Sequence, residues 1–554
     1  MISSDEHQGE TYEVPHRVEG KASCRITVIE VVLVAGAYLA CCIVVLVAIL
    51  RLIQGKMVYT LDDPYIHLAV AEEIAHGHYG VNPDEVSSPA SSALWPVLLA
   101  PLARTQIGEL MPLIINAACG VLTALILLRR LQRELPGRHG GMSALRILIA
   151  LFVIGASNFV ALTFCGMEHC LQILAAIVVT DGILGLVNGE RPGKVFLATL
   201  ILGPLVRYEN LALSGIGCLM LGGRGYWKHA LVCGLGAVAG LAAFSGFLVS
   251  LGLSPLPSSV LVKSSNSSSG ALSLMERLKE GLDYSANCME GLNLMILSSL
   301  LLIYSIMKFF KGPRAWCATI LFMAGFAHVM VGHYGGQGRY VPYIYAALLF
   351  GGCILLFSSM LRRFHWMATA VVASVVMTFG GLSLLREPVR SIADLPTASN
   401  NIYEQQYQMH RFVTDYHDGG VAVNDLGWVS FRNEKHVLDL WGLASFEAFQ
   451  ARVPWRGPEW MEEMASSKHI QLAIIYHDWF TERPKSWVKL AEMKLSRRCV
   501  TPSSNTVSFY STGTGNPELL RERLVAFRSS LPPGVNLTLI GESEAPMGSA
   551  TRSN

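Results

Sequence analysis

Apolar runs of about twenty residues recur along the chain from Ile26 to Leu385, and they constrain its fold more than any other feature. A helix of that length spans the hydrocarbon core of a bilayer. The composition agrees, because 52% of the 554 residues are hydrophobic and only 15% are charged. The sequence therefore predicts an α-helical multi-pass membrane protein, whose membrane domain covers residues 27–385.

Nine of these runs are long enough to cross the bilayer without interruption. Their approximate positions are 27–53, 108–128, 145–164, 168–187, 230–252, 291–310, 315–333, 340–361 and 365–385. Between Lys194 and Gly223 the sequence RYEN breaks the apolar run into two short halves, so we expect a bent hairpin there. Counting this hairpin, about ten to eleven membrane segments are predicted.

Lys and Arg are concentrated in alternate turns between the predicted crossings. These residues are Arg129, Arg130, Arg133, Arg138, Arg146, Arg191, Lys194, Arg224, Lys228, Lys308, Lys311, Arg314, Arg362 and Arg363. Cytoplasmic loops collect basic residues, so we expect these turns to face the cytoplasm. The N-terminal tail 1–26 would then be cytoplasmic, and the loop 54–94 would lie outside the plasma membrane. The first run lacks a small-residue cleavage site and is expected to remain as a crossing.

The C-terminal part differs in composition from the membrane domain. Charged residues become frequent, and strand-like runs occur in GGVAVND, HVLDLWG, IQLAIIY and NTVSFYS, with helical patterns between some of them. Residues 386–531 are therefore predicted to form an extracytoplasmic α/β domain. Residues 532–554 are rich in Gly, Ser and Pro, which is typical of a disordered tail.

Six carboxylates lie between Asp62 and Glu85, directly after the first crossing. Asp63 and Pro64 begin a pattern typical of a short amphipathic helix, whose apolar face could rest on the membrane surface. His67 falls one turn after Asp63, on the same face. An Asp–Pro pair commonly caps a helix, but one cap needs only one carboxylate. Two neighbouring carboxylates tend to have separated pKa values, which suits a proton acceptor, so both roles are open.

Several stretches, taken in chain order, resemble integral membrane glycosyltransferases of the GT-C superfamily. The stretch LDDPYIHLAVAEEIAHGHYGVNP, followed by SSPASSALWPVLLAPL, is similar to their first outer loop. Further similar stretches are FCGMEHCLQIL, LVRYENLAL, HYGGQGRYVPYIYA, NDLGWVSF and VLDLWGLAS. Bacterial polyprenyl-phosphate-dependent arabinofuranosyltransferases and mannosyltransferases are the most similar members, and the likeness covers most of the chain.

The resemblance implies an inverting transfer of a sugar, such as arabinofuranose or mannose, from a polyprenyl-phosphate donor. The acceptor would be a cell-envelope glycan, lipid or protein on the outer face of the membrane. Asp62 or Asp63 would deprotonate the acceptor hydroxyl; if Asp63 caps the helix, Asp62 is the better candidate. No cofactor and no metal ion is expected, although an oxygen-rich site for a divalent cation could form in this loop.

Cations that hold the donor phosphate are expected in the outer turns, because an arginine at membrane depth needs an anionic partner. The candidates are Arg339, Arg207, Lys263 and His333. Arg207 has a carboxylate two residues later, so a structural ion pair is an alternative role. A lone histidine at a helix end is also commonly structural.

Other polar residues of the outer turns are candidates for contacts with the sugar or the acceptor. They are Glu168, His67, Glu209, Tyr340 and Asp425. Glu168 could instead act as an acid at the start of the following helix, and Asp425 could form a turn at a strand end.

Two other classes of protein compete with this interpretation. A transporter or a flippase for lipid-linked sugars also has many crossings and buried charges. However, the chain has no inverted repeat, and it places its acidic patch on an outer loop beside a large outer domain. A non-catalytic membrane scaffold is the third possibility. The net charge of +2 gives no indication of a nucleic-acid partner.

Overall fold

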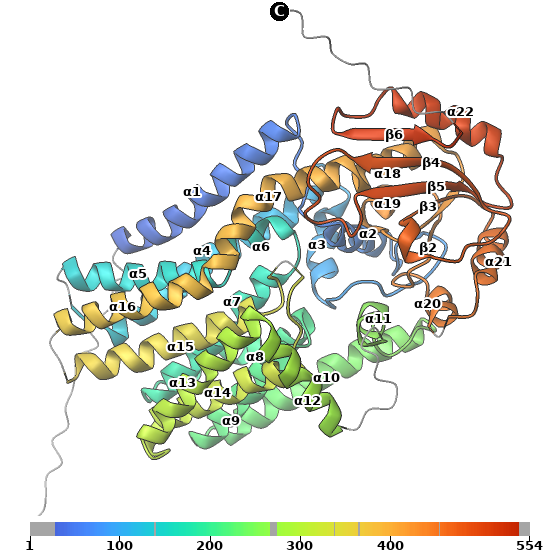
Figure 1. Ribbon diagram of the computed structural model, residues 1–554. Helices are drawn as coiled ribbons and strands as arrows, with labels where there is room; N and C mark the ends of the chain where they lie inside the picture. Colours follow the sequence, from blue (N-terminus) through green and yellow to red (C-terminus); the bar gives the residue numbers. More distant parts are fainter. Residues whose placement is uncertain are drawn as a thin grey trace, which may run out of the picture.

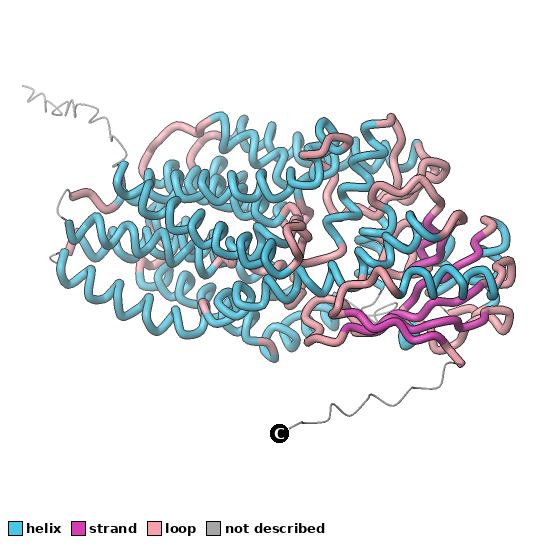
Figure 2. Tube along the Cα trace, turned by 90° about the horizontal axis from the view of Figure 1, so that it is seen from above, coloured by secondary structure: helices cyan, strands magenta, loops and turns pink. Residues whose placement is uncertain are grey.

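The computed structural model describes residues 28–137, 140–265, 274–336, 338–363, 366–453 and 455–541. Its long helices lie side by side in an elongated bundle, and a sheet with its own helices occupies one end of that bundle (Figure 1, Figure 2). The predicted N-terminal tail, residues 1–26, lies outside the described residues.

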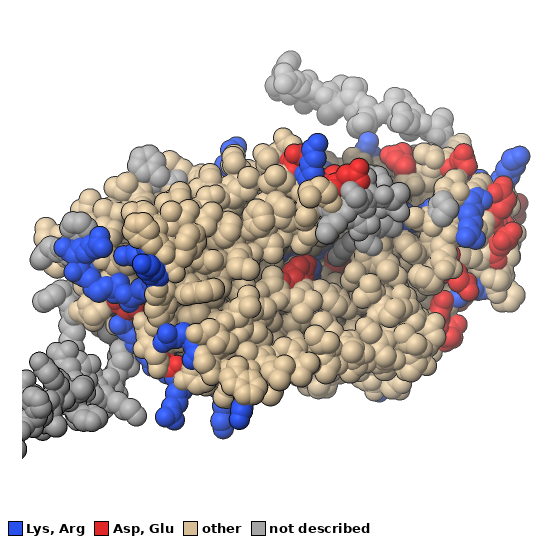
Figure 3. Space-filling model, turned by 90° about the horizontal axis from the view of Figure 1, so that it is seen from below, with Lys and Arg blue, Asp and Glu red and all other residues tan. Residues whose placement is uncertain are grey.

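Eight helices in the described ranges are long and apolar enough to cross a membrane. They are α1 (Val28–Leu52), α4 (Met111–Glu134, which follows the 3-10 turn Gly108–Leu110), α7 (His169–Val187), α10 (Trp227–Ser250), α13 (Met289–Met307), α14 (Gly312–Val331), α15 (Pro342–Leu361) and α16 (Trp366–Leu384). Charged side chains are sparse along the middle of the face seen in Figure 3, as a lipid-facing surface requires. The prediction of a multi-pass helical membrane protein is therefore confirmed.

The crossing predicted at 145–164 is broken in two. It forms α5 (Gly140–Ala156) and α6 (Phe159–Cys165), which are bent by 41° relative to each other. Asn158 lies between them with a φ of 53°, a left-handed conformation that a continuous right-handed helix cannot contain. Because of this bend, α6 packs against α4 and α17 (Arg386–Glu404) and does not continue the line of α5.

The interrupted run after Lys194 forms two short apolar helices, as the sequence predicts. They are α8 (Lys194–Val206) and α9 (Asn210–Gly223), which pack against each other and against α10. The break between them contains Arg207, whose extended backbone ends α8. This pair brings a charged turn into an otherwise apolar bundle.

Shorter helices connect the bundle to the sheet or cover the sheet. They are α2 (Asp63–Ala75), α3 (Trp95–Ala103), α11 (Ser258–Ser265), α12 (Leu274–Asn287), α18 (Gln406–Arg411), α19 (Gly427–Ser430), α20 (Phe446–Arg452), α21 (Glu459–Ser467) and α22 (Pro517–Arg528). The prediction that the helix after Asp62 lies on the membrane surface is wrong. All residues from Pro64 to Ala71 are buried, because α2 packs between α3 and α19.

One mixed sheet of six strands forms the core of the C-terminal domain. The strands are β1 (Gly420–Val423), β2 (Val437–Asp439), β3 (Ile470–Ile475), β4 (Val488–Leu495), β5 (Thr506–Ser511) and β6 (Val535–Leu539). Their order across the sheet is β2-β1-β3-β5-β4-β6. The first three strands are parallel, for example Ala422 opposite Ala473, and the remaining pairs are antiparallel. The predicted α/β domain is present at the end of the bundle.

The structure corrects one boundary of this domain. A disordered tail is predicted from residue 532, but residues 535–539 form β6, which pairs with β4 from Val535 opposite Leu495 to Leu539 opposite Ala491. The ordered domain therefore extends at least to the end of β6, and the rest of the predicted tail, from residue 542, lies outside the described residues.

Candidate functional site

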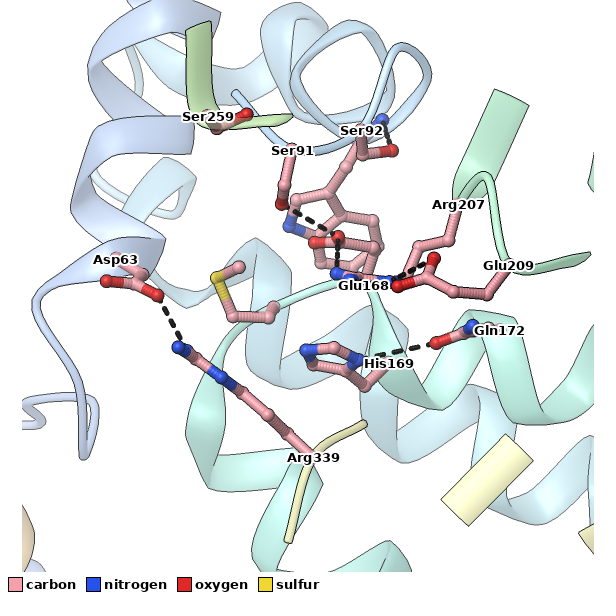
Figure 4. Close-up of polar contacts among 12 residues, drawn as sticks. Asp63, Ser91, Ser92, Glu168, His169, Gln172, Arg207, Glu209, Ser259 and Arg339 are labelled. Atoms are coloured by element: carbon pink, nitrogen blue, oxygen red, sulfur yellow. Dashed lines mark hydrogen bonds and ion pairs between the residues drawn. The ribbon is translucent and has the colours of Figure 1, made fainter. Parts of the chain in front are cut away.

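Asp63 and Arg339 form an ion pair between the start of α2 and the loop before α15. An Nη1–H of Arg339 donates to Oδ2 of Asp63 at 2.6 Å, and Figure 4 shows the two side chains pointing toward each other. The side chain of Arg339 is 15% exposed, whereas that of Asp63 is 39% exposed. Asp63 thus keeps open surface beside a cation that is largely withdrawn from water.

Asp62 binds the C-terminal domain and makes no capping bond to α2. Its Oδ2 accepts a hydrogen bond from the backbone N–H of Gly427 at 2.7 Å, and its Oδ1 accepts one from that of Trp428 at 2.8 Å. Both N–H groups belong to the first turn of α19, where backbone donors lack helical partners. Asp62 therefore fastens the loop between α1 and α2 to the sheet domain.

Asp425 lies at the carboxyl end of β1, close to the carboxyl end of the parallel strand β3. Its Oδ2 accepts hydrogen bonds from the Tyr476 hydroxyl at 2.5 Å and from Nε2 of Gln406 at 2.9 Å. The carboxyl ends of parallel strands meet at one edge of a sheet, which is where such sheets commonly bind ligands. In this protein the same edge receives the loop that carries Asp62.

These carboxylates influence one another. Burial raises the pKa of Asp62 well above its usual range, the nearby charge of Asp425 raises it further, and the two N–H donors of α19 oppose the shift. Burial also raises the pKa of Asp425, against hydrogen bonds from Tyr476 and Gln406. No group of three or more His, Cys, Asp or Glu side chains within the described residues could hold a metal ion.

A second polar cluster lies deeper between α2, α7 and the turn before α9. Nη1 of Arg207 contacts Oε1 of Glu168 at 2.7 Å, and its Nη2 contacts Oε1 of Glu209 at 2.8 Å. Oγ of Ser91 donates to Glu168 at 3.1 Å, and Nε2 of His67 lies 3.8 Å from the same carboxylate. Figure 4 shows Ser91, Glu168 and Arg207 converging from separate elements.

Glu168 is completely buried beside the guanidinium of Arg207. Burial alone would raise its pKa, but the charges of Arg207 and His67 lower it to about 2. Two carboxylates therefore satisfy the guanidinium of Arg207, which is only 6% exposed. This arrangement favours the structural ion pair, the alternative role that the sequence leaves open for Arg207.

Tyr340 connects the two clusters. Its ring centre lies 5.2 Å from the Cζ atom of Arg339 and 5.9 Å from that of Arg207, within the range of cation–π contacts. The rings of His169 and His333 lie 6.3 and 6.1 Å from it. Tyr340 thus separates two arginines that would otherwise repel each other.

An open cavity of about 340 Å³ adjoins the Asp63–Arg339 pair. Arg339 lines it together with Arg390 and Arg498, and Asp394 accepts two hydrogen bonds from Arg498 at 2.9 and 3.1 Å. Its apolar lining consists of Leu61, Ala161, Leu162, Cys165, Leu395, Ala398 and Val500. Glu387 and Asp394 also line the cavity, so three arginines and two acids face an apolar wall that includes residues of α6.

The structure divides the predicted site residues into three groups. Asp62, Asp63, Asp425 and Arg339 gather where the outer loop meets the sheet domain, and Glu168, His67, Arg207 and Glu209 form the buried second cluster, with Tyr340 between them. His333 is exposed, and its carbonyl lies 3.3 Å from Nε2 of His328. Lys263 lies in α11, but its side chain is outside the described part of the structure.

Sequence reasoning missed the partners of these residues. Tyr476 and Gln406 hold Asp425, Ser91 holds Glu168, and Arg390 and Arg498 line the cavity. Ser91 belongs to the stretch SSPASSALWP, whose density of small polar residues before an apolar helix is the one available signal. The other contacts join distant parts of the chain and have no local pattern.

Comparison with protein families gives one partial match. Residues 400–510 match a family model described as a domain of unknown function (DUF8728). This region includes Asp425, Gly427 and Tyr476, and it covers only part of the chain. No curated protein matches the chain by sequence.

Solved structures of an archaeal oligosaccharyltransferase from Archaeoglobus fulgidus are similar to this chain. The apo form is 11% identical, with a TM-score of 0.45, and the alignment covers 84% of this chain and 74% of that chain. The oligosaccharyltransferase AglB from the same organism, in complex with an inhibitory peptide and a dolichol-phosphate, is 11% identical, with a TM-score of 0.44 and coverages of 91% and 75%. TM-scores this low do not identify a function.

Proposed function

We propose that this chain is an inverting membrane glycosyltransferase of the GT-C type, which uses a polyprenyl-phosphate sugar as donor. The observation that carries the proposal is the Asp63–Arg339 pair, with its 2.6 Å contact, at the edge of a cavity in which Arg339 lies opposite an apolar wall. The acceptor is the hydroxyl of a cell-envelope glycan, lipid or protein.

The cavity suits the charge that develops during such a transfer. A polyprenyl-phosphate sugar is a phosphodiester with one negative charge, and the departing lipid phosphate gains a second charge. Donors placed where this charge develops stabilise the transition state. Arg339 meets this need, since its buried Nε–H has no hydrogen-bond partner among the described residues. The apolar wall around Leu162 suits the first part of the lipid chain.

The reaction is a single displacement at the anomeric carbon. The acceptor oxygen forms a bond to that carbon while the bond from the carbon to the phosphate oxygen breaks, and the acceptor proton moves to a carboxylate. Asp63 is the better base, because its side chain is 39% exposed beside the cavity. Asp62 is occupied by two backbone N–H groups and is a positioning residue.

The remaining predicted residues support this arrangement. The guanidinium of Arg207 forms ion pairs with Glu168 and Glu209 next to Tyr340. The ring of Tyr340 in turn orients Arg339. Asp425 fixes the edge of the sheet against which the catalytic loop packs. The acceptor would approach from the side of the sheet domain, and the donor from the bilayer.

Replacement of the acids tests the proposal directly. In membranes supplied with a lipid-linked labelled sugar, Asp63→Asn should reduce sugar transfer by about 10²- to 10⁴-fold, the usual contribution of a general base. Asp84→Asn is a matched control, because this acid belongs to the same loop and its side chain is 69% exposed. Full activity of Asp63→Asn would exclude it as the base.

Loss of the protein distinguishes a transferase from a flippase. Mass spectrometry of cells that lack the chain should find unused lipid-linked sugar on the outer leaflet, where a transferase would consume it. Accumulation on the inner leaflet would instead support a flippase and contradict the proposed function.

A further inference from the structure

A second cavity, of about 490 Å³, lies at the opposite end of the bundle from the sheet domain. The ends of α4 and α15, the start of α14 and the turn after α7 surround it, and these helices pack against one another. Lys and Arg side chains gather at this end of the molecule (left in Figure 3). None of its residues belongs to the proposed sugar-transfer site.

The carboxylates of this cavity are largely engaged by buried or neighbouring arginines. Oε1 of Glu190 contacts Arg130 at 2.8 Å, and its Oε2 lies 3.4 Å from Arg133. Glu134 lies 3.8 Å from Arg130 and 3.9 Å from Arg314. The cavity therefore retains an excess of positive charge on the side of α14 and α15.

Arg362 carries most of that excess. It lines the cavity directly after α15, and its Nη2 donates a hydrogen bond to Oγ of Ser359 at 3.2 Å. No carboxylate lies within ion-pair distance of Arg362 in the ranges that the structure describes. Partial burial and the nearby charge of Arg314 hold the pKa of Arg362 below its usual value. Arg314 and Arg362 thus face a common space, in which Glu134 lies 3.9 Å from Arg314 and no carboxylate of the described residues pairs with Arg362.

Ser358 supplies an independent sign of a ligand. Its side chain lines the cavity and is only 2% exposed, yet its Oγ has no hydrogen-bond partner among the described residues. A buried hydroxyl without a partner costs about 1–3 kcal/mol, so such groups are normally satisfied. The start of α14 borders the same cavity through Arg314. Free N–H groups at a helix start also favour an anion.

From this geometry we infer that the cavity binds the phosphate group of an anionic membrane lipid. Arg314 and Arg362 bind the phosphate, and the Ser358 hydroxyl donates a hydrogen bond to it. A lipid is the source that the position favours, because the cavity opens where the apolar helices end and basic side chains gather. The site is independent of sugar transfer.

Lipid retention tests the inference. The full chain, purified and placed in nanodiscs of phosphatidylcholine with added phosphatidylglycerol, should retain phosphatidylglycerol in native mass spectra. Each basic residue near a membrane surface contributes about 1 kcal/mol to binding an anionic lipid, so Arg362→Gln and Arg314→Gln should each weaken retention about fivefold. The double variant should weaken it by more than about tenfold.

Matched variants separate this site from general basic attraction. Arg363→Gln removes an equally exposed charge one residue away, outside the cavity lining, and should leave retention unchanged. Ser358→Ala removes no charge but should weaken retention about two- to tenfold, as the loss of one hydrogen bond does. Unchanged thermal unfolding in pure phosphatidylcholine shows that the variants remain folded.

Two outcomes would overturn the inference. Equal loss from Arg363→Gln and Arg362→Gln would mean that only the overall charge attracts the lipid. If inorganic phosphate alone stabilises the protein in phosphatidylcholine nanodiscs, and phosphatidylglycerol does not, the ligand is a soluble phosphate and the lipid assignment is wrong.

Discussion

Asp62 experiences opposing influences at a single carboxyl group. The N–H groups of Gly427 and Trp428 favour the charged form, whereas burial and the neighbouring Asp425 and Asp63 favour the protonated form. The net result is a raised pKa, so the folded protein holds a proton on Asp62 at pH values where the unfolded chain has lost it.

Stability should consequently depend on pH through Asp62. The contribution of protonated Asp62 to the free energy of unfolding is fully present below the ordinary Asp pKa of about 4. It is lost as the pH rises toward the raised pKa of Asp62 in the folded protein. Asp62→Asn cannot titrate, so we expect its Tm to fall less than that of the wild type between about pH 5 and pH 8. Thermal unfolding in detergent measures the difference.

The control for this experiment is Asp84→Asn. Interaction with His436 lowers the pKa of Asp84 despite the opposing effect of burial, so this acid is charged throughout the same pH interval. Its variant should keep the wild-type pH dependence. If Tm changed with pH equally in the wild type and in Asp62→Asn, the raised pKa of Asp62 would be contradicted.

Arg339 should affect the donor more than the acceptor. Hydrogen bonds to charged groups contribute about 1.5–3 kcal/mol, so Arg339→Ala should raise the KM for the lipid-linked donor roughly 10- to 100-fold. Arg390→Ala removes a cavity arginine that is 67% exposed and should have a much smaller effect. Steady-state kinetics with each substrate varied separately would reveal the difference, and an unchanged donor KM would remove this role.

At the scale of elements, α19 docks onto the outer loop through a close backbone approach. A Cβ atom added to Gly427 would lie 2.1 Å from the carbonyl oxygen of Asp62 and 2.7 Å from its Oδ2. Neither the backbone nor the hydrogen-bonded carboxylate can yield easily at that distance. Only glycine therefore permits this contact between α19 and the loop before α2.

Gly427→Ala should accordingly separate α19 from the outer loop. Overpacking of this kind typically costs about 1–3 kcal/mol, and the displaced loop should also lower sugar transfer. Gly215→Ala in α9 is a suitable control, because nothing lies within 4 Å of its added Cβ. Chemical denaturation and the transfer assay would both report the change, and equal stability of the two variants would refute this explanation.

The strand-like runs of the sequence predict β1, β2, β3 and β5 correctly. They do not predict β4 and β6. β4 carries charged residues such as Lys489 and Glu492 among its buried ones, so its mean composition resembles a surface segment. β6 lies in a Gly- and Pro-rich region and is ordered because it pairs with β4. Such strands owe their structure to partners that a local pattern does not contain.

At the scale of the whole molecule, a cluster of basic residues and the sheet domain lie at opposite ends of the helical bundle (Figure 1, Figure 3). Basic residues favour the cytoplasmic side, so the sheet domain and the proposed active site should face outward. This orientation places the Asp63–Arg339 pair where a lipid-linked sugar would be exposed.

Labelling with a membrane-impermeant maleimide tests the orientation. In a Cys499→Ser background, Lys485→Cys on the sheet domain should react in intact cells, and Lys311→Cys at the basic end should react only after the cells are opened. Both positions are exposed. The reverse pattern would place the sheet domain inside the cell.

The sequence by itself determined the apolar character and the approximate positions of the eight long helices, because each depends on about twenty consecutive residues, whereas the bend in the run 145–164 was not predicted. It also drew attention to the acid pair and to Arg339. Only the tertiary structure decided their roles, since Asp63 meets Arg339 across 276 positions and Asp62 meets Gly427 across 365. Contacts so distant depend on how helices and sheet pack together, and no local periodicity encodes them.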